Sequence, residues 1–180
     1  IDNATGAIKA MSGGRETTGR SLLNRAVSTF QPGSSIKPFT VYGAALQNSY
    51  ELAAAGKYQG FYETKYDQQG VNLMGNYITC ASVFDDEPLK VNGRIWPKND
   101  DSSYSGLVSF RTAIQESINV VAVKICAQVG AEYAFEMSQR FGLESLDPEY
   151  DVNYSSMALG GTYSGVTTVQ MARATSVYVN

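Results

Sequence analysis

Apolar positions recur closely between residues 35 and 48. Almost no polar face remains in this stretch, whose apolar members beyond Pro38 are Phe39, Val41, Tyr42, Ala44, Ala45 and Leu46. Because a surface helix keeps a polar face, the pattern predicts a helix that is buried on most sides. Pro32 and Gly33 break the preceding structure, so Gly33 or Ser34 is expected to cap the first turn. Pro38 then lies where a missing amide proton costs little.

Helical spacing returns in the second half of the chain. Four more helices are predicted there, over residues 110–115, 120–129, 131–141 and 167–178. Ser109 is expected to cap the first of them, while Gly130 and Gly142 are expected to end the second and the third.

Alternation typical of strands is weaker and confined to short stretches. Residues 1–14 combine a turn sequence with alternating small and polar positions, which predicts a hairpin lying in a sheet against the buried helix. Residues 81–84 predict a short strand, and the acidic run 85–88 that follows is expected to be a solvated turn. Residues 50–79 and 89–106 show no clear period and are predicted to be loop with short irregular elements.

Composition limits the architecture and the class of partner. With 180 residues, 43% hydrophobic and 17% charged, the chain can bury one core, so one α/β (α+β) unit is expected. A net charge of −3 with scattered basic residues argues against nucleic acid as a partner. No apolar run approaches the roughly 20 residues that span a bilayer. Because the chain begins at Ile1 rather than at methionine, we expect a segment of a longer protein.

The two cysteines, Cys80 and Cys126, match no zinc spacing and form no C-x-x-C pair. A metal site is therefore not expected, and the sequence leaves open whether the two cysteines are bridged. No cofactor motif is present, since the glycines of residues 157–165 do not follow a strand in a G-x-G-x-x-G frame. These glycines are instead predicted to form tight packing turns.

Ser34 and Lys37 are the first candidates for chemistry. Residues three apart on a helix share a face, so the Lys37 ammonium can reach the Ser34 hydroxyl. To act as a base near neutral pH, the lysine needs its pKa lowered by roughly 3 units, about 4 kcal/mol, which burial can supply. The chain contains no histidine, so a Ser-His-Asp triad is impossible. The alternative is a capping serine followed by a solvated lysine.

A second candidate is the stretch Ser117-Ile118-Asn119, between two of the predicted helices. If the junction is bent, the serine and the asparagine project into the same cleft. The alternative is an ordinary cap or turn, because a serine and an asparagine at this spacing are common.

Taken in order, these motifs resemble the transpeptidase domain of penicillin-binding proteins, in particular the bifunctional class A members. Residues 31–39, Gln-Pro-Gly-Ser-Ser-Ile-Lys-Pro-Phe, resemble the S-x-x-K region, and residues 117–119 are similar to the S-x-N motif. The resemblance covers nearly the whole chain, including residues 1–14, 24–26, 85–88 and 158–161.

The resemblance implies a peptidoglycan DD-transpeptidase that crosslinks stem peptides through a serine acyl-enzyme and is inhibited by β-lactams. Carried over by position, Ser34 would attack the D-Ala-D-Ala carbonyl, and Lys37 would take the serine proton. Ser117 would relay a proton to the departing D-alanine, and Asn119 would hold the substrate amide. The implied fold is β-lactamase/transpeptidase-like, an antiparallel sheet packed by helices plus an all-helical part that carries S-x-N.

One motif of the family is absent, since no lysine here is followed by Thr-Gly or Ser-Gly. We therefore expect residues 1–180 to form an incomplete domain, a partial penicillin-binding transpeptidase domain. The implied partners are stem peptides ending in D-Ala-D-Ala and β-lactam antibiotics, with no metal, cofactor or nucleic acid. The implied location is the extracytoplasmic face of the bacterial cytoplasmic membrane, through an anchor that this chain lacks.

Two other functions remain open from the sequence. A hydrolase of the same fold, either a β-lactamase or a DD-carboxypeptidase, would differ by letting water reach the acyl-enzyme. A non-catalytic β-lactam sensor or binding module would keep the pocket for occupancy alone.

Overall fold

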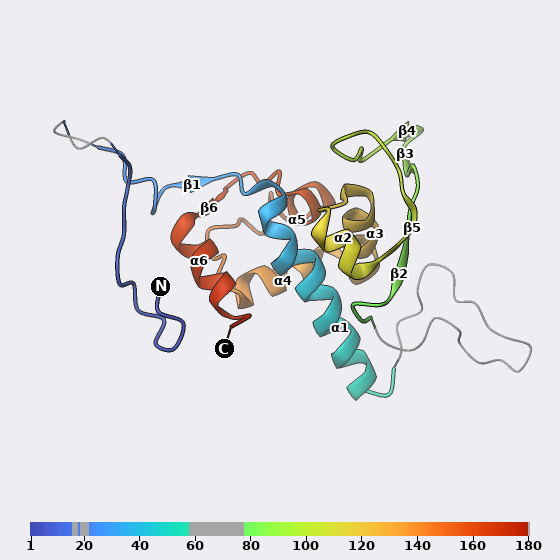
Figure 1. Cartoon of the computed structure of the whole chain (residues 1–180), viewed down its shortest axis with the longest axis horizontal. Coiled ribbons are helices and arrows are strands. Elements are labelled where there is room, and N and C mark those ends of the chain that lie inside the picture. The colour runs from blue at the N-terminus through green and yellow to red at the C-terminus, as the bar shows by residue number, and fades with distance from the viewer. Residues whose placement is uncertain (16–17, 19–21, 58–77, 180) are drawn as a thin grey trace, which may run out of the picture.

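A computed structural model of the chain describes residues 1–15, 18, 22–57 and 78–179. The helix predicted after Pro32 is present and runs through the middle of the molecule (Figure 1). It is wound in three ways, as a 3-10 turn η1 (Gly33–Ile36), a π-helical turn η2 (Pro38–Tyr42) and the α-helix α1 (Gly43–Ala54). The prediction that Gly33 or Ser34 caps the first turn is wrong, because Pro32 holds the cap position and makes no side-chain cap hydrogen bond.

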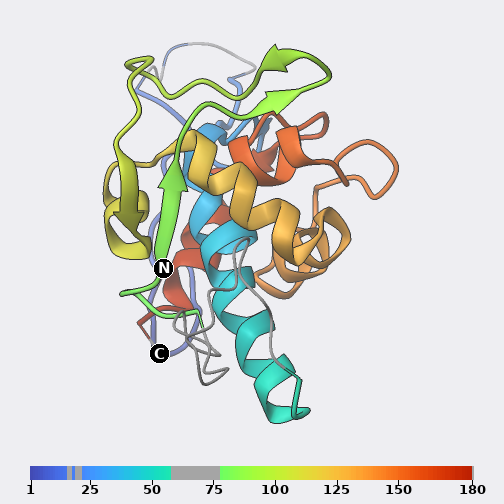
Figure 2. The same cartoon turned by 90° about the vertical axis from the view of Figure 1, so that its right-hand side faces the viewer.

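Three further helices pack on this central rod. They are α3 (Asn119–Val129), α4 (Ala131–Arg140) and α5 (Tyr154–Leu159). Both α3 and α4 contact α1, and α3 also packs closely on α5 (Figure 2). Each fully buried aliphatic side chain of such a core contributes roughly 1.5–3 kcal/mol through the removal of apolar surface from water. Nowhere in the described ranges is a helix long and apolar enough to cross a bilayer.

Most helix boundaries in the second half follow the local signals in the sequence. The helix α2 (Phe110–Gln115) is capped as predicted, since the Thr112 N–H donates to Ser109 Oγ at 3.0 Å. Gly130, at φ +92°, ends α3 as predicted, and α4 ends just before Gly142. The sequence did not predict α5, although Asn153 caps it through its side chain.

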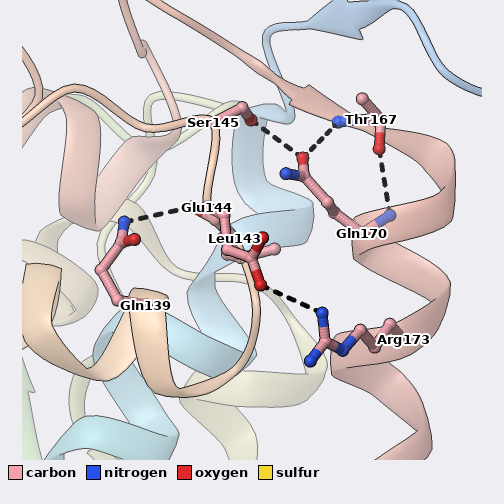
Figure 3. Close-up of polar contacts among 7 residues, drawn as sticks. All are labelled: Gln139, Leu143, Glu144, Ser145, Thr167, Gln170 and Arg173. Atoms are coloured by element: carbon pink, nitrogen blue, oxygen red, sulfur yellow. Dashed lines mark hydrogen bonds and ion pairs between the residues drawn. The ribbon is translucent and has the colours of Figure 1, made fainter.

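The last helix, α6 (Thr168–Ser176), confirms the helix predicted over residues 167–178. Thr167 and Gln170 form a reciprocal capping box at its start. Figure 3 shows that Gln170 also ties the helix to the loop after α4, because its Oε1 accepts from Ser145 Oγ at 2.8 Å as well as from the Thr167 N–H at 2.9 Å. Gln170 therefore both caps α6 and joins this helix to the loop after α4.

The described strands form three separate antiparallel pairs, which are β1 (Thr29–Phe30) with β6 (Val166–Thr167), β2 (Val83–Asp86) with β5 (Gly106–Ser109), and β3 (Lys90–Val91) with β4 (Arg94–Ile95). The β1–β6 pair and the β2–β5 pair lie on opposite sides of α1 (Figure 1). The predicted combination of helices with antiparallel strands is therefore present, as short pairs around a helical core.

Three predictions about strands and loops were wrong. The turn near residue 3 exists, with the Gly6 N–H donating to Asp2 O at 2.8 Å, but residues 1–15 form no strand and are mostly exposed. Their small side chains bury too little apolar surface to hold a hairpin. The acidic run is not simply a solvated turn, since Asp86 ends β2 and is 1% exposed. The segment predicted as loop after residue 89 contains the β3–β4 hairpin.

The loop predicted over residues 50–79 is also wrong at its start, because α1 continues to Ala54. The remainder of that prediction lies largely outside the described residues.

Candidate active site

Ser34 lies in the 3-10 turn at the start of the central rod, and its side chain is exposed. Its hydroxyl makes no hydrogen bond within the part of the chain that the structure describes. The Lys37 N–H donates to Ser34 O across this turn. Residues i and i+3 eclipse one another in a 3-10 helix, so Ser34 and Lys37 leave the turn on the same side, but among the described residues the Lys37 Nζ bonds Ser117 and Asn119 rather than Ser34 Oγ.

The turn carrying Ser34 is held from the end of α5. The Gly33 N–H donates to Gly160 O at 3.3 Å, and Gln31 Nε2 donates to Thr162 O at 3.0 Å. Gly160 has φ +72°, and a Cβ built on it would lie 2.0 Å from Gly33 O. The predicted tight packing turn is thus confirmed at this glycine, where the two backbones meet.

Lys37 is 1% exposed, although it is three residues from an exposed serine. Its Nζ donates to Ser117 O at 2.6 Å, Ser117 Oγ at 3.1 Å and Asn119 Oδ1 at 2.6 Å, so the three protons of the ammonium each have an acceptor. Burial lowers the pKa of Lys37 to about 8, against the smaller opposing effect of the Asp100 charge. A freely solvated lysine, the alternative considered above, is not what the structure contains.

The junction between α2 and α3 is bent, as the second motif requires. Ser117 has φ +53°, and the Ile118 N–H donates to Ala113 O at 3.1 Å. This backbone conformation is uncommon outside glycine. The bend turns Ser117 and Asn119 toward the same Lys37 ammonium. Of the four predicted site residues, the structure joins three by hydrogen bonds and leaves the Ser34 hydroxyl facing solvent.

Two residues that the sequence did not single out also belong to the site. The Asn119 and Val120 N–H groups donate to Asn99 Oδ1 at 3.1 and 3.2 Å, and Asn99 Nδ2 donates to Asp86 Oδ1 at 2.8 Å. Both came from stretches predicted as solvated turn or loop, and no period in the sequence marks them as buried.

The chemistry that this arrangement allows is proton transfer beside an exposed hydroxyl. A lysine with a pKa near 8 is neutral in an appreciable fraction of molecules at pH 7 to 8, and a neutral amine can accept the proton of an attacking alcohol. Among the described residues, no group of three His, Cys, Asp or Glu side chains could hold a metal ion. The cysteines are not bridged, since Cys80 is exposed and Cys126 is buried, each with a free thiol.

Comparison with known proteins identifies the class. The family model described as the penicillin binding protein transpeptidase domain matches residues 73–180, which include Ser117 and Asn119. The chain therefore belongs to the penicillin-binding protein transpeptidase family.

Individual relatives match the chain along its whole length. Penicillin-binding protein 1A of Neisseria meningitidis serogroup A is 34% identical over 188 residues, covering 100% of this chain and 19% of the relative. Penicillin-binding protein 1A of Clostridium botulinum is 32% identical over 183 residues, covering 100% of this chain and 20% of the relative. The chain thus spans about a fifth of the length of these curated relatives.

Solved structures agree with this fold. Penicillin-binding protein 1A of Haemophilus influenzae is 27% identical with a TM-score of 0.59, over 87% of this chain and 19% of that one. PonA1 of Mycobacterium tuberculosis in complex with penicillin V is 20% identical with a TM-score of 0.69, over 98% of this chain and 41% of that one. The predicted family and the β-lactamase/transpeptidase-like fold class are confirmed.

Proposed function

We propose that this chain carries the serine acyl-transfer centre of a peptidoglycan DD-transpeptidase, with Ser34 as nucleophile and Lys37 as base. The observation that carries the proposal is the buried Lys37 amine, whose pKa of about 8 places its neutral form within reach at physiological pH. It lies one 3-10 turn from an exposed serine whose hydroxyl has no competing hydrogen bond within the described residues. The chain belongs to a family described as the penicillin binding protein transpeptidase domain, and a transpeptidase performs acyl transfer of this kind.

The proposed reaction follows from the donors and acceptors around Lys37. In the ammonium form all three protons are donated. After loss of one proton, the amine can keep its bonds to Ser117 O and Asn119 Oδ1, while its lone pair accepts a proton from a hydroxyl. Ser34 Oγ then attacks the carbonyl of the D-Ala-D-Ala bond as its proton passes to Lys37 Nζ, and the Ser34 backbone N–H contributes half of the oxyanion hole.

Collapse of the tetrahedral intermediate breaks the amide C–N bond. The proton held by Lys37 passes through Ser117 Oγ, 3.1 Å away, to the departing D-alanine amine. Asn119 holds the substrate amide. An amine of a second stem peptide then attacks the ester carbonyl, forming the crosslink and returning a proton to Ser34. In this proposal β-lactams acylate the same serine, and the solved complex of PonA1 with penicillin V supports this point. The reaction would take place on the extracytoplasmic side of the membrane.

Intact-mass spectrometry after incubation with penicillin tests the assignment on the protein in its full natural length. We expect one covalent adduct on the wild type and none on Ser34→Ala. Ser35→Ala is the matched control, because Ser35 is also exposed but its hydroxyl donates to Pro32 O at 2.6 Å. An adduct that persists in Ser34→Ala, or a wild type that forms none, would overturn the proposal.

Turnover separates the proposal from its two alternatives. A transpeptidase is expected to release a chromogenic β-lactam slowly and to join two stem peptides ending in D-Ala-D-Ala. Fast steady-state turnover of the β-lactam would instead indicate a hydrolase. Acylation without any joining or hydrolysis of stem peptides would indicate a sensor.

A further inference from the structure

A pair of polar residues outside both sequence motifs lies behind the site. Asp86, at the end of β2, is 1% exposed, and Asn99, in the loop after β4, is 9% exposed. Burying polar groups of this kind is unfavourable unless each is hydrogen-bonded, so their partners indicate what the pair does.

The first set of partners is the start of α3. The residue at the cap position is Ile118, which has no side chain able to accept the unpaired N–H groups of the first turn. Asn99 Oδ1 takes this role from a distant loop, accepting from the Asn119 N–H at 3.1 Å and from the Val120 N–H at 3.2 Å. The helix that carries the S-x-N asparagine is therefore capped by another segment of the chain.

The second set of partners fixes the orientation of the Asn99 amide. Its Nδ2 donates to Asp86 Oδ1 at 2.8 Å and to Ser103 O at 2.9 Å. Asp86 Oδ2 accepts from the Ser105 N–H at 2.9 Å, so both carboxylate oxygens are bonded. Since a flipped amide would point its NH₂ at two N–H groups and its oxygen at two acceptors, only one orientation is satisfied.

The Asn99 cap is connected to Lys37 through Asn119. Asn119 is held through its N–H by Asn99, and its Nδ2 donates to Lys98 O at 3.0 Å. Its remaining polar atom, Oδ1, accepts from Lys37 Nζ at 2.6 Å. The loop that contains Asn99 therefore fixes the position of the Asn119 side chain. Asn119 Oδ1 is one of the three acceptors around Lys37 Nζ, so this loop also fixes part of the surroundings of the lysine.

We propose that Asp86 and Asn99 are positioning residues, which fix the start of α3 and, through Asn119, the orientation of Lys37 for acyl transfer. Neither residue touches substrate. Their effect on acylation rests on the proposed function, whereas their effect on the start of α3 does not.

An exchange of the two side chains tests the pair. Asn99→Asp keeps an acceptor for α3 but loses both donors and places a second carboxylate against Asp86. We expect acylation by penicillin to slow on the order of 10- to 100-fold, the scale of a small misplacement of a reacting group. In the double variant Asp86→Asn with Asn99→Asp, the new amide at position 86 can donate to the new carboxylate. We expect most of the rate to return.

Hydrogen exchange supplies a readout that does not depend on catalysis. Repulsion from Asp86 is expected to displace the new carboxylate from the start of α3, so the Asn119 and Val120 amides should exchange faster in Asn99→Asp and recover in the double variant. Glu87→Gln is the matched control, because Glu87 follows Asp86 in the chain but is exposed. It should change neither the rate nor the exchange of the two amides.

Asn99→Asp acylated at the wild-type rate, or a double variant no faster than Asn99→Asp, would overturn the pairing. If the wild type is not acylated at all, the proposed function fails, and unchanged exchange at Asn119 and Val120 would then independently overturn the positioning. Should Asn99→Asp fail to fold, Asp86→Asn is compared with the double variant instead, since the single oxygen of its amide can accept from Asn99 Nδ2 or from the Ser105 N–H but not from both.

Discussion

Ser34 and Lys37 are three residues apart, yet the structure holds them in different ways. The lysine side is fixed by side chains, through Ser117, Asn119 and the pair behind them. The serine side is fixed by backbone, through the contact of Gly33 with Gly160. The group whose protonation must be controlled is buried among polar partners, while the group that must meet a substrate stays exposed. We therefore expect the lysine to be sensitive to changes of side-chain chemistry and the serine turn to be sensitive to changes that crowd the backbone.

Replacement of Lys37 by methionine should have the largest effect. Methionine fills similar space but removes the base, so acylation should fall on the order of 10²- to 10⁴-fold, the usual contribution of a positioned general base. The rate of adduct formation with penicillin measures this. Lys57→Met, in the described segment after α1 and far along the chain from the motif, serves as the control.

Lys37→Met also leaves Ser117 O and Asn119 Oδ1 without their buried donor, so a loss of thermal stability is expected as well. The comparison is therefore made at a temperature where both proteins are folded. Acylation of Lys37→Met within tenfold of the wild-type rate would remove the lysine from the mechanism.

The pH dependence of acylation should give the next largest effect. Because burial lowers the pKa of Lys37 to about 8, the fraction of neutral amine that can act as a base falls progressively as the pH drops below 8. The rate should rise about tenfold per pH unit from pH 6 and level off above pH 8, a change of roughly 100-fold overall. The second-order rate constant measured across this range tests the sign.

The same profile distinguishes a buried lysine from a solvated one. A solvated lysine would keep the rate rising toward pH 10, near its ordinary pKa. Burial also raises the pKa values of three tyrosines, Tyr42, Tyr133 and Tyr178, the last two to about 12, so these groups do not titrate within this range. A rate independent of pH between 6 and 8 would contradict the proposed base.

The sequence predicted the features that depend on local signals and missed those that depend on distant partners. Helices with local signals were correct, such as α2 with its Ser109 cap and α3 with its Gly130 stop. Those signals act within a few residues, and a single sequence displays them directly. The S-x-x-K spacing predicted that one helical turn separates Ser34 from Lys37, and the structure has such a turn, although it is 3-10 rather than α-helical.

What the sequence did not reveal depends on partners far along the chain. Asp86 and Asn99 look like any polar loop residues until β2 and the loop after β4 bring them together at the start of α3, so their burial could not be predicted from the local sequence. The β3–β4 hairpin is different, because Asn92 and Gly93 both have positive φ and form the Asn-Gly turn that favours hairpins. That signal is local and is present in the sequence.

The backbone contact between Gly33 and Gly160, which holds the serine turn, is tested by a glycine-to-alanine substitution. In Gly160→Ala the new Cβ would lie 2.0 Å from Gly33 O, a backbone atom, so the turn carrying Ser34 must move. Gly56→Ala is the matched control, since Gly56 has a similar φ of +68° with nothing within 4 Å. The control should cost about 1 kcal/mol from backbone strain alone, measured by denaturant unfolding.

Gly160→Ala should cost that amount plus about 1–3 kcal/mol for the forced shift, and should slow acylation about tenfold. The pH midpoint near 8 should stay unchanged, because the partners of Lys37 are on the other side of the site. A shifted midpoint would show that the two sides are coupled, so that the serine turn and the lysine network move together. Equal effects of the two alanine substitutions would show that the Gly33–Gly160 contact yields easily and does not fix Ser34.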